Sequence, residues 1–377
     1  MLEPWEKSEA PRDVPRAPKL QPFAEDIERI ARQIAEADCP IISVENVGPS
    51  HEGFDALVAF AEQIGAPVVE GEGAFFRNFP KSHDLYLLQS IEPLLGKTVL
   101  ALLIESRAPW YPPSNTPKGA KIVSISKNPL REHMVLQAMH AEDYLEGSVA
   151  ASLRALSEAL QAIGLDTDTI TNRRMKWRQQ HDVWCAGAAK QEKQAEVAES
   201  ITPPLVMKLL REVVGADCCV LDETIVHQTG IRGLLSWDDP LTFFRAPSGL
   251  GQGLGYALGA KLALPQRPVT VTIGNESLMY NPVVPTPALI DEHALPQLIL
   301  VFNNSQYAVM KNFHKRFYTD GVAVADDVYH RVKICGPRYE ESATMIGGIG
   351  QRVKIPESCE MRSQQPTQAS GPARPRS

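Results

Sequence analysis

Residues 268–304 decide the fold of this chain. They begin with an apolar run, Pro268-Val-Thr-Val-Thr-Ile273, which leads into the polar loop Gly274-Asn-Glu-Ser277. A segment long enough for a helix follows, and then a second apolar run, Gln297-Leu-Ile-Leu-Val-Phe302, which ends at Asn303-Asn304. Two buried strands joined by a helical crossover predict a right-handed βαβ unit with parallel strands. Both polar loops are therefore expected at the same edge of one sheet.

A glycine-rich segment, Ser248-Gly-Leu-Gly-Gln-Gly-Leu-Gly255, lies just before this unit. Glycines let the backbone adopt positive φ and approach a ligand closely. Helix amino termini at the carboxyl ends of parallel strands suit a diphosphate. The segment does not satisfy the Gly-x-Gly-x-x-Gly fingerprint of dinucleotide folds, because Leu254 stands where the third glycine belongs. A dinucleotide-dependent oxidoreductase therefore rests on fold analogy alone.

Together the two patterns resemble the diphosphate- and metal-binding signature of thiamine diphosphate enzymes, in which Gly-Asp-Gly-Ser is followed by a helix, a strand and Asn-Asn. The resemblance implies thiamine diphosphate and Mg²⁺ as cofactors. It implies metal ligands at Asn275, Asn304 and the backbone carbonyl of Gln306. It also implies cofactor-binding residues at Ser248, Gly249, Leu250, Gly274, Glu276 and Ser277. In the family, a bulky apolar residue at the position of Leu250 supports the cofactor in a bent conformation; the alternative is that Leu250 is an ordinary core residue. The alternative for Asn303-Asn304 is a simple turn after the strand.

The centre of the signature differs from the family pattern, because Asn275-Glu276 replaces Asp-Gly. Asn275 keeps an oxygen ligand but loses a formal charge. Glu276 brings a carboxylate beside the expected diphosphate, and two like charges about 4 Å apart repel by about 1 kcal/mol in water and about 4 kcal/mol at a protein surface. We expect weaker cofactor binding from this repulsion. The alternative is that the pair has traded places and Glu276 supplies the missing charge.

Two Rossmann-like α/β domains with mainly parallel sheets are expected from the alternation of helical patterns and continuous apolar strands. Strands are predicted at 41–44, 68–69, 99–104, 121–125, 218–221, 268–273 and 297–302. The predicted boundaries are a flexible segment at 1–21, a middle domain at 22–165, a connecting helical segment at 166–200, a diphosphate-binding domain at 201–358 and a disordered tail at 359–377.

The resemblance also bears on what the chain can do alone. Thiamine diphosphate enzymes of the acetolactate synthase type carry a pyrimidine-binding domain, a middle domain and a diphosphate-binding domain. Arg107-Ala-Pro-Trp110 looks like middle-domain sequence of that branch, in which some members bind FAD or ADP. No pyrimidine domain is recognised here, and no catalytic residue is assigned. Asp222-Glu-Thr and His227 fall in a loop that borders the diphosphate in relatives, although a packing role is the alternative for His227.

Charge and composition limit the partners and the cellular location that can be expected. A net charge of −7 without a basic run argues against nucleic acid as the main partner. Residues 1–22 lack the apolar core of a signal peptide, and no stretch is long and apolar enough for a membrane span, so a cytoplasmic location is expected. The six cysteines, none in a Cys-x-x-Cys pair, favour free and mostly buried thiols.

The function expected from the resemblance is decarboxylation of a 2-oxo acid, with the carbanion passed to a proton, an aldehyde or a ketone. Activity would need a pyrimidine domain from another chain, so a homo- or hetero-oligomer is expected. The alternative is a non-catalytic, truncated family member that binds a nucleotide or a partner subunit.

Overall fold

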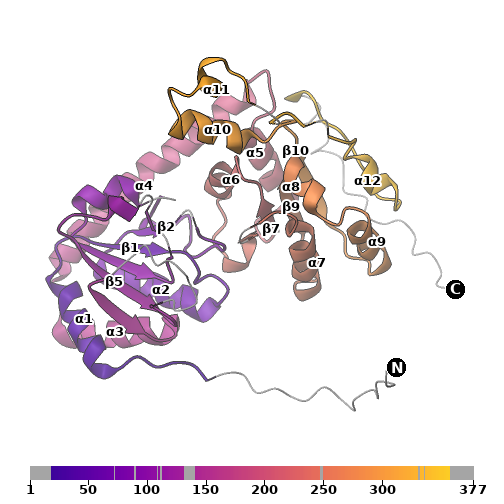
Figure 1. The fold of residues 1–377 in the computed structure, drawn as a ribbon. Helices are drawn as coiled ribbons and strands as arrows, with labels where there is room; N and C mark the ends of the chain where they lie inside the picture. Colours follow the sequence, from indigo (N-terminus) through magenta and orange to yellow (C-terminus); the bar gives the residue numbers. More distant parts are fainter. Residues whose placement is uncertain are drawn as a thin grey trace, which may run out of the picture.

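Two parallel β-sheets joined by a long helix make up the described part of the chain (Figure 1). In the computed structural model, the described residues run from 18 to 356, except for 72, 89–90, 108, 111–112, 131–140, 247–248, 330–331 and 335. The predicted flexible segment up to residue 17 and the predicted tail lie outside them. Within the described residues, no helix combines the length and hydrophobicity needed to span a membrane.

The first sheet has six parallel strands in the order β3-β2-β1-β4-β5-β6. Its central strands are apolar on both faces because helices cover both sides of a parallel sheet. The strands are β1 Pro40–Val44, β2 Val68–Glu70, β3 Tyr86–Leu88, β4 Leu100–Ile104, β5 Lys121–Ser126 and β6 Asp143–Glu146. The helices are α1 Ala24–Glu36, α2 His51–Ile64 and α3 Val149–Ile163, with short 3₁₀ turns η1 Glu92–Lys97 and η2 Pro113–Asn115.

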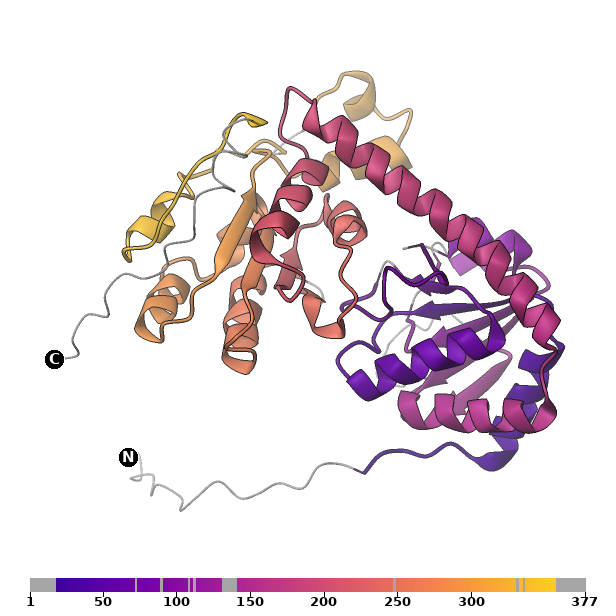
Figure 2. The ribbon, with the colours of Figure 1, turned by 180° about the vertical axis from the view of Figure 1, so that it is seen from behind.

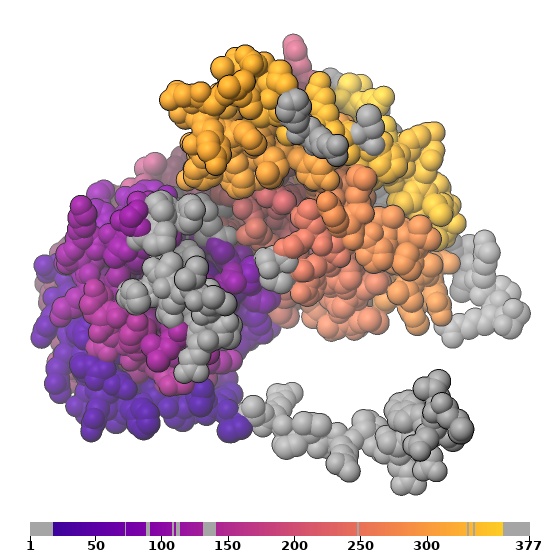
Figure 3. Space-filling view, in the orientation of Figure 1, coloured from indigo at the N-terminus to yellow at the C-terminus, as the bar shows by residue number. Residues whose placement is uncertain are grey.

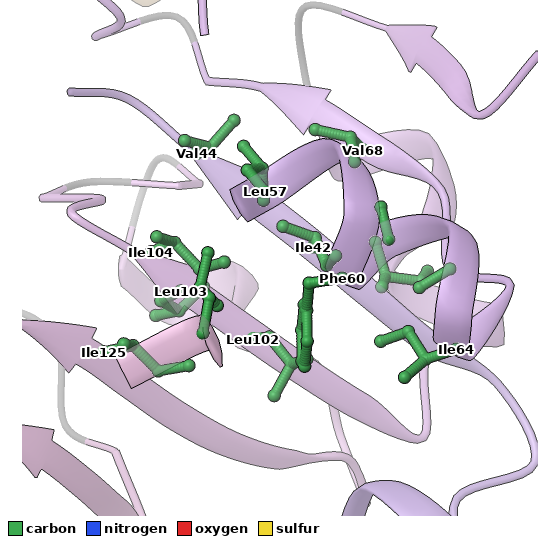
Figure 4. Close-up of a cluster of buried hydrophobic side chains, with 14 of the residues drawn as sticks. Ile42, Val44, Leu57, Phe60, Ile64, Val68, Leu102, Leu103, Ile104 and Ile125 are labelled. Carbon is green, nitrogen blue, oxygen red and sulfur yellow. The ribbon is translucent and has the colours of Figure 1, made fainter. Parts of the chain in front are cut away.

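The core of this unit forms where α2 lies on the sheet. Leu57, Phe60 and Ile64 of α2 project toward Ile42 and Leu102 of the two central strands (Figure 4). Local sequence sets the limits of α2: the Ser50 hydroxyl accepts a hydrogen bond from the Gly53 amide at its start, and Gly65 adopts a φ of 63° at its end.

Helix α4, Thr167–Glu196, joins the two units and is 30 residues long. Asp166 caps its start, because the Asp166 carboxylate accepts a hydrogen bond from the Thr169 amide. Figure 2 shows it running from the first sheet to the second across one side of the molecule. Most of its residues are exposed, as expected for the connecting segment, while Trp177 and His181 are buried.

The second sheet has four parallel strands in the order β10-β9-β7-β8, so the two predicted Rossmann-like units with parallel sheets are confirmed. The strands are β7 Cys219–Glu223, β8 Phe243–Arg245, β9 Val269–Gly274 and β10 Leu298–Phe302. The helices are α5 Pro203–Val214, α6 Gln228–Leu234, α7 Gly253–Ala263, α8 Asn275–Tyr280, α9 Pro285–Glu292, α10 Ala308–Phe317, α11 Val322–Ala325 and α12 Glu341–Thr344, with the 3₁₀ turn η3 Pro240–Thr242.

Residues 218–221, at the start of β7, point alternately into separate cores on the two faces of this sheet. Cys218 and Val220 pack on one side, and Cys219 and Leu221 on the other. Strand β10 lies at the edge and pairs with β9, and its five apolar residues are only partly covered. Residues from α10 onward form the upper surface of this unit in the space-filling view (Figure 3).

Backbone and side-chain bonds join the two units directly. Phe76 and Phe244 form an antiparallel bridge, and the Arg245 amide donates to the Phe75 carbonyl at 2.8 Å. Arg77 is fully buried beside this bridge. Its guanidinium donates to Glu70 Oε2 at 3.0 Å and to the Leu235 carbonyl at 3.2 Å, so one side chain ties the first sheet to the second unit.

One expectation needs correction. Cys218 and Cys219 are buried free thiols as predicted, but Cys185 is exposed on α4, because a helix with so few apolar neighbours leaves most of its surface in solvent. The predicted domain boundaries stay a proposal; the first sheet lies within 22–165 and the second within 201–358.

Candidate diphosphate and metal site

Strands β9 and β10 bring the two polar loops of the signature together. Phe302 pairs with Gly274 in the parallel register, so both strands end at the same edge of the sheet. Helix α8 begins immediately after β9, at Asn275. The loop after β10 is held by its own asparagines: Asn303 Oδ1 accepts from the Ser305 amide, and Asn304 Oδ1 accepts from the Gln306 amide, each at 3.0 Å.

The Asn275 side chain is fully buried at the centre of this edge. One terminal atom of its amide lies 2.7 Å from Glu276 Oε2, 3.2 Å from the Phe302 carbonyl oxygen and 3.3 Å from Asn304 Oδ1. All three neighbours are oxygen acceptors. With nitrogen at this position, the two amide hydrogens point at three acceptors.

The Glu276 carboxylate turns inward, toward Asn275, and the residue is only 8% exposed. It lies over Gly274: a methyl group added there would meet Glu276 Oε2 at 3.2 Å and Ser277 Oγ at 3.7 Å. Burial raises the pKa of the Glu276 carboxyl, and a hydrogen bond from its own backbone amide opposes the shift. Glu276 therefore points into the expected cofactor site.

Three tyrosines surround the cluster. The Tyr339 ring lies beside Asn275, and burial raises the pKa of its phenol while the Asn275 amide opposes the shift. A hydrogen bond with Tyr280 raises the pKa of Tyr307, and burial and the Glu276 charge act in the same direction. Sequence reasoning missed Tyr339, because a tyrosine far along the chain in an irregular stretch carries no local signal.

The second part of the glycine-rich segment, Gly251 to Gly253, binds a side chain of the protein itself. The Glu223 carboxylate, at the end of β7, accepts from the amides of Gly251 at 2.6 Å, Gln252 at 3.0 Å and Gly253 at 2.9 Å. Asn281 Nδ2 donates to the same carboxylate at 2.8 Å. These amides were expected to face a phosphate, and an internal anion occupies them instead.

Close packing explains two of the glycines. Gly251 has a φ of 93°, and a side chain there would meet the Tyr280 carbonyl oxygen at 2.5 Å. At Gly253 a side chain would meet Glu223 Oε2 at 2.7 Å. The usable sequence signal was an acidic residue at the end of a strand ahead of a glycine-rich turn.

The other predicted residues have different surroundings. Gly249 is exposed and Leu250 is half-buried, while Ser248 lies outside the described residues. Gln306 faces Lys333 in an antiparallel bridge, next to the asparagine cluster. The ring of His227 lies 5.4 Å from that of Phe302, and burial lowers its pKa, which fits the packing role.

In the first sheet, a buried acid stands at the crevice where parallel sheets of this kind bind nucleotides. Glu45 follows β1 and is fully buried. It accepts from the Arg107 amide at 2.9 Å and the Ser106 hydroxyl at 3.2 Å. FAD or ADP at this crevice stays a prediction.

The donor set at the second sheet fits a hard divalent cation. Carboxylate, amide and carbonyl oxygens meet at one point, and these are the ligands that Mg²⁺ prefers. Among the described residues, no group of three or more His, Cys, Asp or Glu side chains could hold a metal ion, so a site here would depend on amide and carbonyl oxygens beside Glu276.

Comparison with known proteins identifies a domain family and several similar enzymes. Residues 227–373 match the family model of the thiamine pyrophosphate enzyme C-terminal TPP-binding domain. Human 2-hydroxyacyl-CoA lyase 2 is 24% identical over 365 residues, which cover 93% of this chain and 52% of the relative. The acetolactate synthase large subunit of Corynebacterium glutamicum is 25% identical over 320 residues, covering 80% of this chain and 48% of the relative.

Solved structures share the fold. Benzoylformate decarboxylase from Polynucleobacter necessarius superposes with a TM-score of 0.71 at 17% identity, covering 95% of this chain and 65% of that one. The 4-hydroxybenzoylformate decarboxylase of Rhodococcus jostii gives the same score and identity, covering 94% and 63%. The chain spans about half the length of the curated relatives named above. Residues 227–373 thus resemble the C-terminal domain of thiamine pyrophosphate enzymes in sequence, and the chain shares its fold with solved structures of such enzymes.

Proposed function

We propose that the chain binds thiamine diphosphate with Mg²⁺ and serves a decarboxylase or carboligase of the acetolactate synthase type, acting on a 2-oxo acid. The meeting of Asn275, Glu276 and Asn304 at the end of β9 and β10 carries the proposal. Relatives named as acetolactate synthase, benzoylformate decarboxylase and 2-hydroxyacyl-CoA lyase support the broader class. When bound, the cofactor supplies the carbanion chemistry.

The residues of this chain would hold the cofactor rather than move protons. Asn304 and the Gln306 carbonyl, fixed by the turn after β10, would hold the cation from one side. Gly274, Glu276 and Ser277 would face the diphosphate from the other, with Ser248, Gly249 and Leu250 along the rest of the cofactor. No described residue is assigned to activate the pyrimidine ring. We propose that a pyrimidine domain on another polypeptide does so, which makes the working form an oligomer.

Calorimetry with thiamine diphosphate and Mg²⁺ tests the binding proposal. We expect saturable binding of one cofactor per chain that requires Mg²⁺. Asn304→Ala should weaken it strongly, because it removes an oxygen from the cation site. Ser305→Ala is the matched control, since among the described residues this hydroxyl donates a hydrogen bond to Asn303 of the same turn. Wild-type protein that is folded but shows no binding would overturn the proposal.

The alternative is a non-catalytic family member that binds a nucleotide or a partner subunit. The replacement of Asp-Gly by Asn275-Glu276 favours it, if the Glu276 charge repels the diphosphate. Binding of ADP in the same calorimeter, without binding of thiamine diphosphate, would support this alternative.

A further inference from the structure

We propose that Glu276 supplies the anionic oxygen of the cation site, so that the carboxylate of the signature has moved one residue along the chain. The inference deepens the proposed function and rests on it for the identity of the cation as Mg²⁺. Its basis is the side-chain geometry at the end of β9, where this chain departs from the family pattern.

The first observation is the crowding of acceptors around one atom of the Asn275 amide. Glu276 Oε2, the Phe302 carbonyl and Asn304 Oδ1 all lie within 3.3 Å of it. If the atom is nitrogen, its two hydrogens serve three acceptors. If it is oxygen, four oxygens converge with no hydrogen between them, an arrangement that a cation stabilises.

The distances fit such a cation. Neighbouring ligands of an octahedral Mg²⁺ with bonds of about 2.0–2.1 Å stand about 3 Å apart. The three separations from the Asn275 atom are 2.7, 3.2 and 3.3 Å. A rotation of the buried amide by half a turn exchanges its nitrogen for its oxygen, so the same backbone geometry serves both states.

The second observation is a buried hydroxyl without a partner. Ser277 is 1% exposed, and its Oγ has no hydrogen bond within the described residues. It lies on the same side of Gly274 as Glu276 Oε2. A buried hydroxyl is costly unless it is paired, and a diphosphate oxygen or a water bound to the cation would pair it.

The inward direction of Glu276 decides between the two roles open to this residue. A carboxylate that merely avoided the diphosphate would turn to solvent, since α8 has exposed positions at Met279 and Tyr280. Instead its Oε2 lies 2.7 Å from the Asn275 amide, which also lies 3.3 Å from Asn304 Oδ1. The lost charge at position 275 is therefore restored within the same cluster.

Metal titrations test the assignment. With thiamine diphosphate saturating, the Mg²⁺ concentration for half-maximal binding should rise about 10–100-fold in Glu276→Gln. The double variant Asn275→Asp/Glu276→Gly should restore it to near the wild-type value. Glu292→Gln, an exposed acid on α9, is the matched control and should change nothing. Circular dichroism and urea midpoints establish that each variant is folded.

A second readout does not need the cofactor. Tb³⁺ bound beside Tyr280, Tyr307 and Tyr339 should luminesce on excitation of the tyrosines, and Glu276→Gln should lose this signal. If Glu276→Gln binds cofactor more tightly, or leaves both readouts unchanged, the assignment is overturned. A Glu276-dependent Tb³⁺ signal without thiamine diphosphate binding would keep the metal site and overturn the proposed function. If thiamine diphosphate binds and its Mg²⁺ dependence is the same in wild type and Glu276→Gln, the proposed function stands and the Glu276 assignment is overturned. If the wild-type protein binds neither Tb³⁺ nor thiamine diphosphate, the assignment and the proposed function are both overturned.

Discussion

The Glu223 carboxylate lies 2.9 Å from the Gly253 amide and holds the start of α7 in place. Because three backbone amides and Asn281 converge on this one anion, its loss leaves several buried donors unsatisfied. We predict that Glu223→Gln costs about 1–3 kcal/mol of unfolding free energy. Urea unfolding measures this loss of stability, and Glu36→Gln on the exposed face of α1 is the control. Equal stability of the two variants would show that the amides find other partners.

The Arg77–Glu70 ion pair is buried between the two units. Arg77→Met leaves an uncompensated buried carboxylate and should cost about 3–5 kcal/mol in urea unfolding. Replacing both residues by Met should recover most of that loss, because well-packed apolar side chains can substitute for a buried pair. A double variant no more stable than the single one would contradict this account.

Asp222 gives the second unit a pH dependence. Burial raises its pKa to about 6 from 3.8, and the Thr224 and Thr272 hydroxyls oppose the shift. A raised carboxyl pKa means that the folded state binds the proton more tightly. The contribution of Asp222 to the free energy of unfolding is therefore greatest below about pH 4. It falls as the pH rises to about 6, by about 3 kcal/mol in total.

Asp222→Asn removes the titrating group and tests this dependence. We expect the free energy of unfolding of the variant to rise relative to that of the wild type as the pH increases from 4 to 8, so that the two curves converge or cross. A constant difference between the two across the range would refute the assignment.

Self-association is predicted from exposed apolar side chains beside the candidate site. Met279 is 49% exposed and Tyr280 is 59% exposed, next to the half-buried Leu250 and Tyr307. Such patches usually find a partner. Sedimentation at micromolar concentration should show a species larger than the monomer, and Met279→Glu should dissociate it. Met175→Glu, at an equally exposed methionine of α4, should not. A strictly monomeric wild-type chain would contradict the prediction.

The 377-residue chain alone should not decarboxylate pyruvate measurably, because no residue is assigned to activate the pyrimidine ring. A steady-state assay at saturating thiamine diphosphate and Mg²⁺ checks this. Turnover in the usual enzyme range of about 1–1000 per second would show that the chain contains a complete site.

The long apolar strands of both sheets were predictable from sequence, because runs such as 99–104 and 268–273 leave few alternatives. Strands β3 and β8 were missed, since three residues carry too short a pattern. Strand β6 was missed as well, because Asp143 and Glu146 give it the polarity of a loop. In each case the neighbouring strand supplies the hydrogen bonds, and that partner is not encoded locally.

The candidate site was likewise predictable from the sequence in part. The meeting of Asn275 and Asn304 follows from a right-handed crossover, which the spacing of the two apolar runs predicts. The inward turn of Glu276 does not, because the first side chains of the short α8 are aimed by the packing around Gly274. The capture of the glycine amides by Glu223 also depends on how β7 and α7 meet, which the order of residues does not reveal.

Strand β10 forms an edge of the second sheet to which a further strand can add. Within the described residues its outer edge pairs with no strand, and residues 298–302 contain neither a charge nor a proline, the two devices that most often protect such an edge. An extended segment of any polypeptide that reaches this edge can continue the hydrogen-bond ladder. The number of strands in this sheet is therefore a property of the assembly in which the chain is placed, and the strand that leads into Asn303 and Asn304 would become an interior strand there.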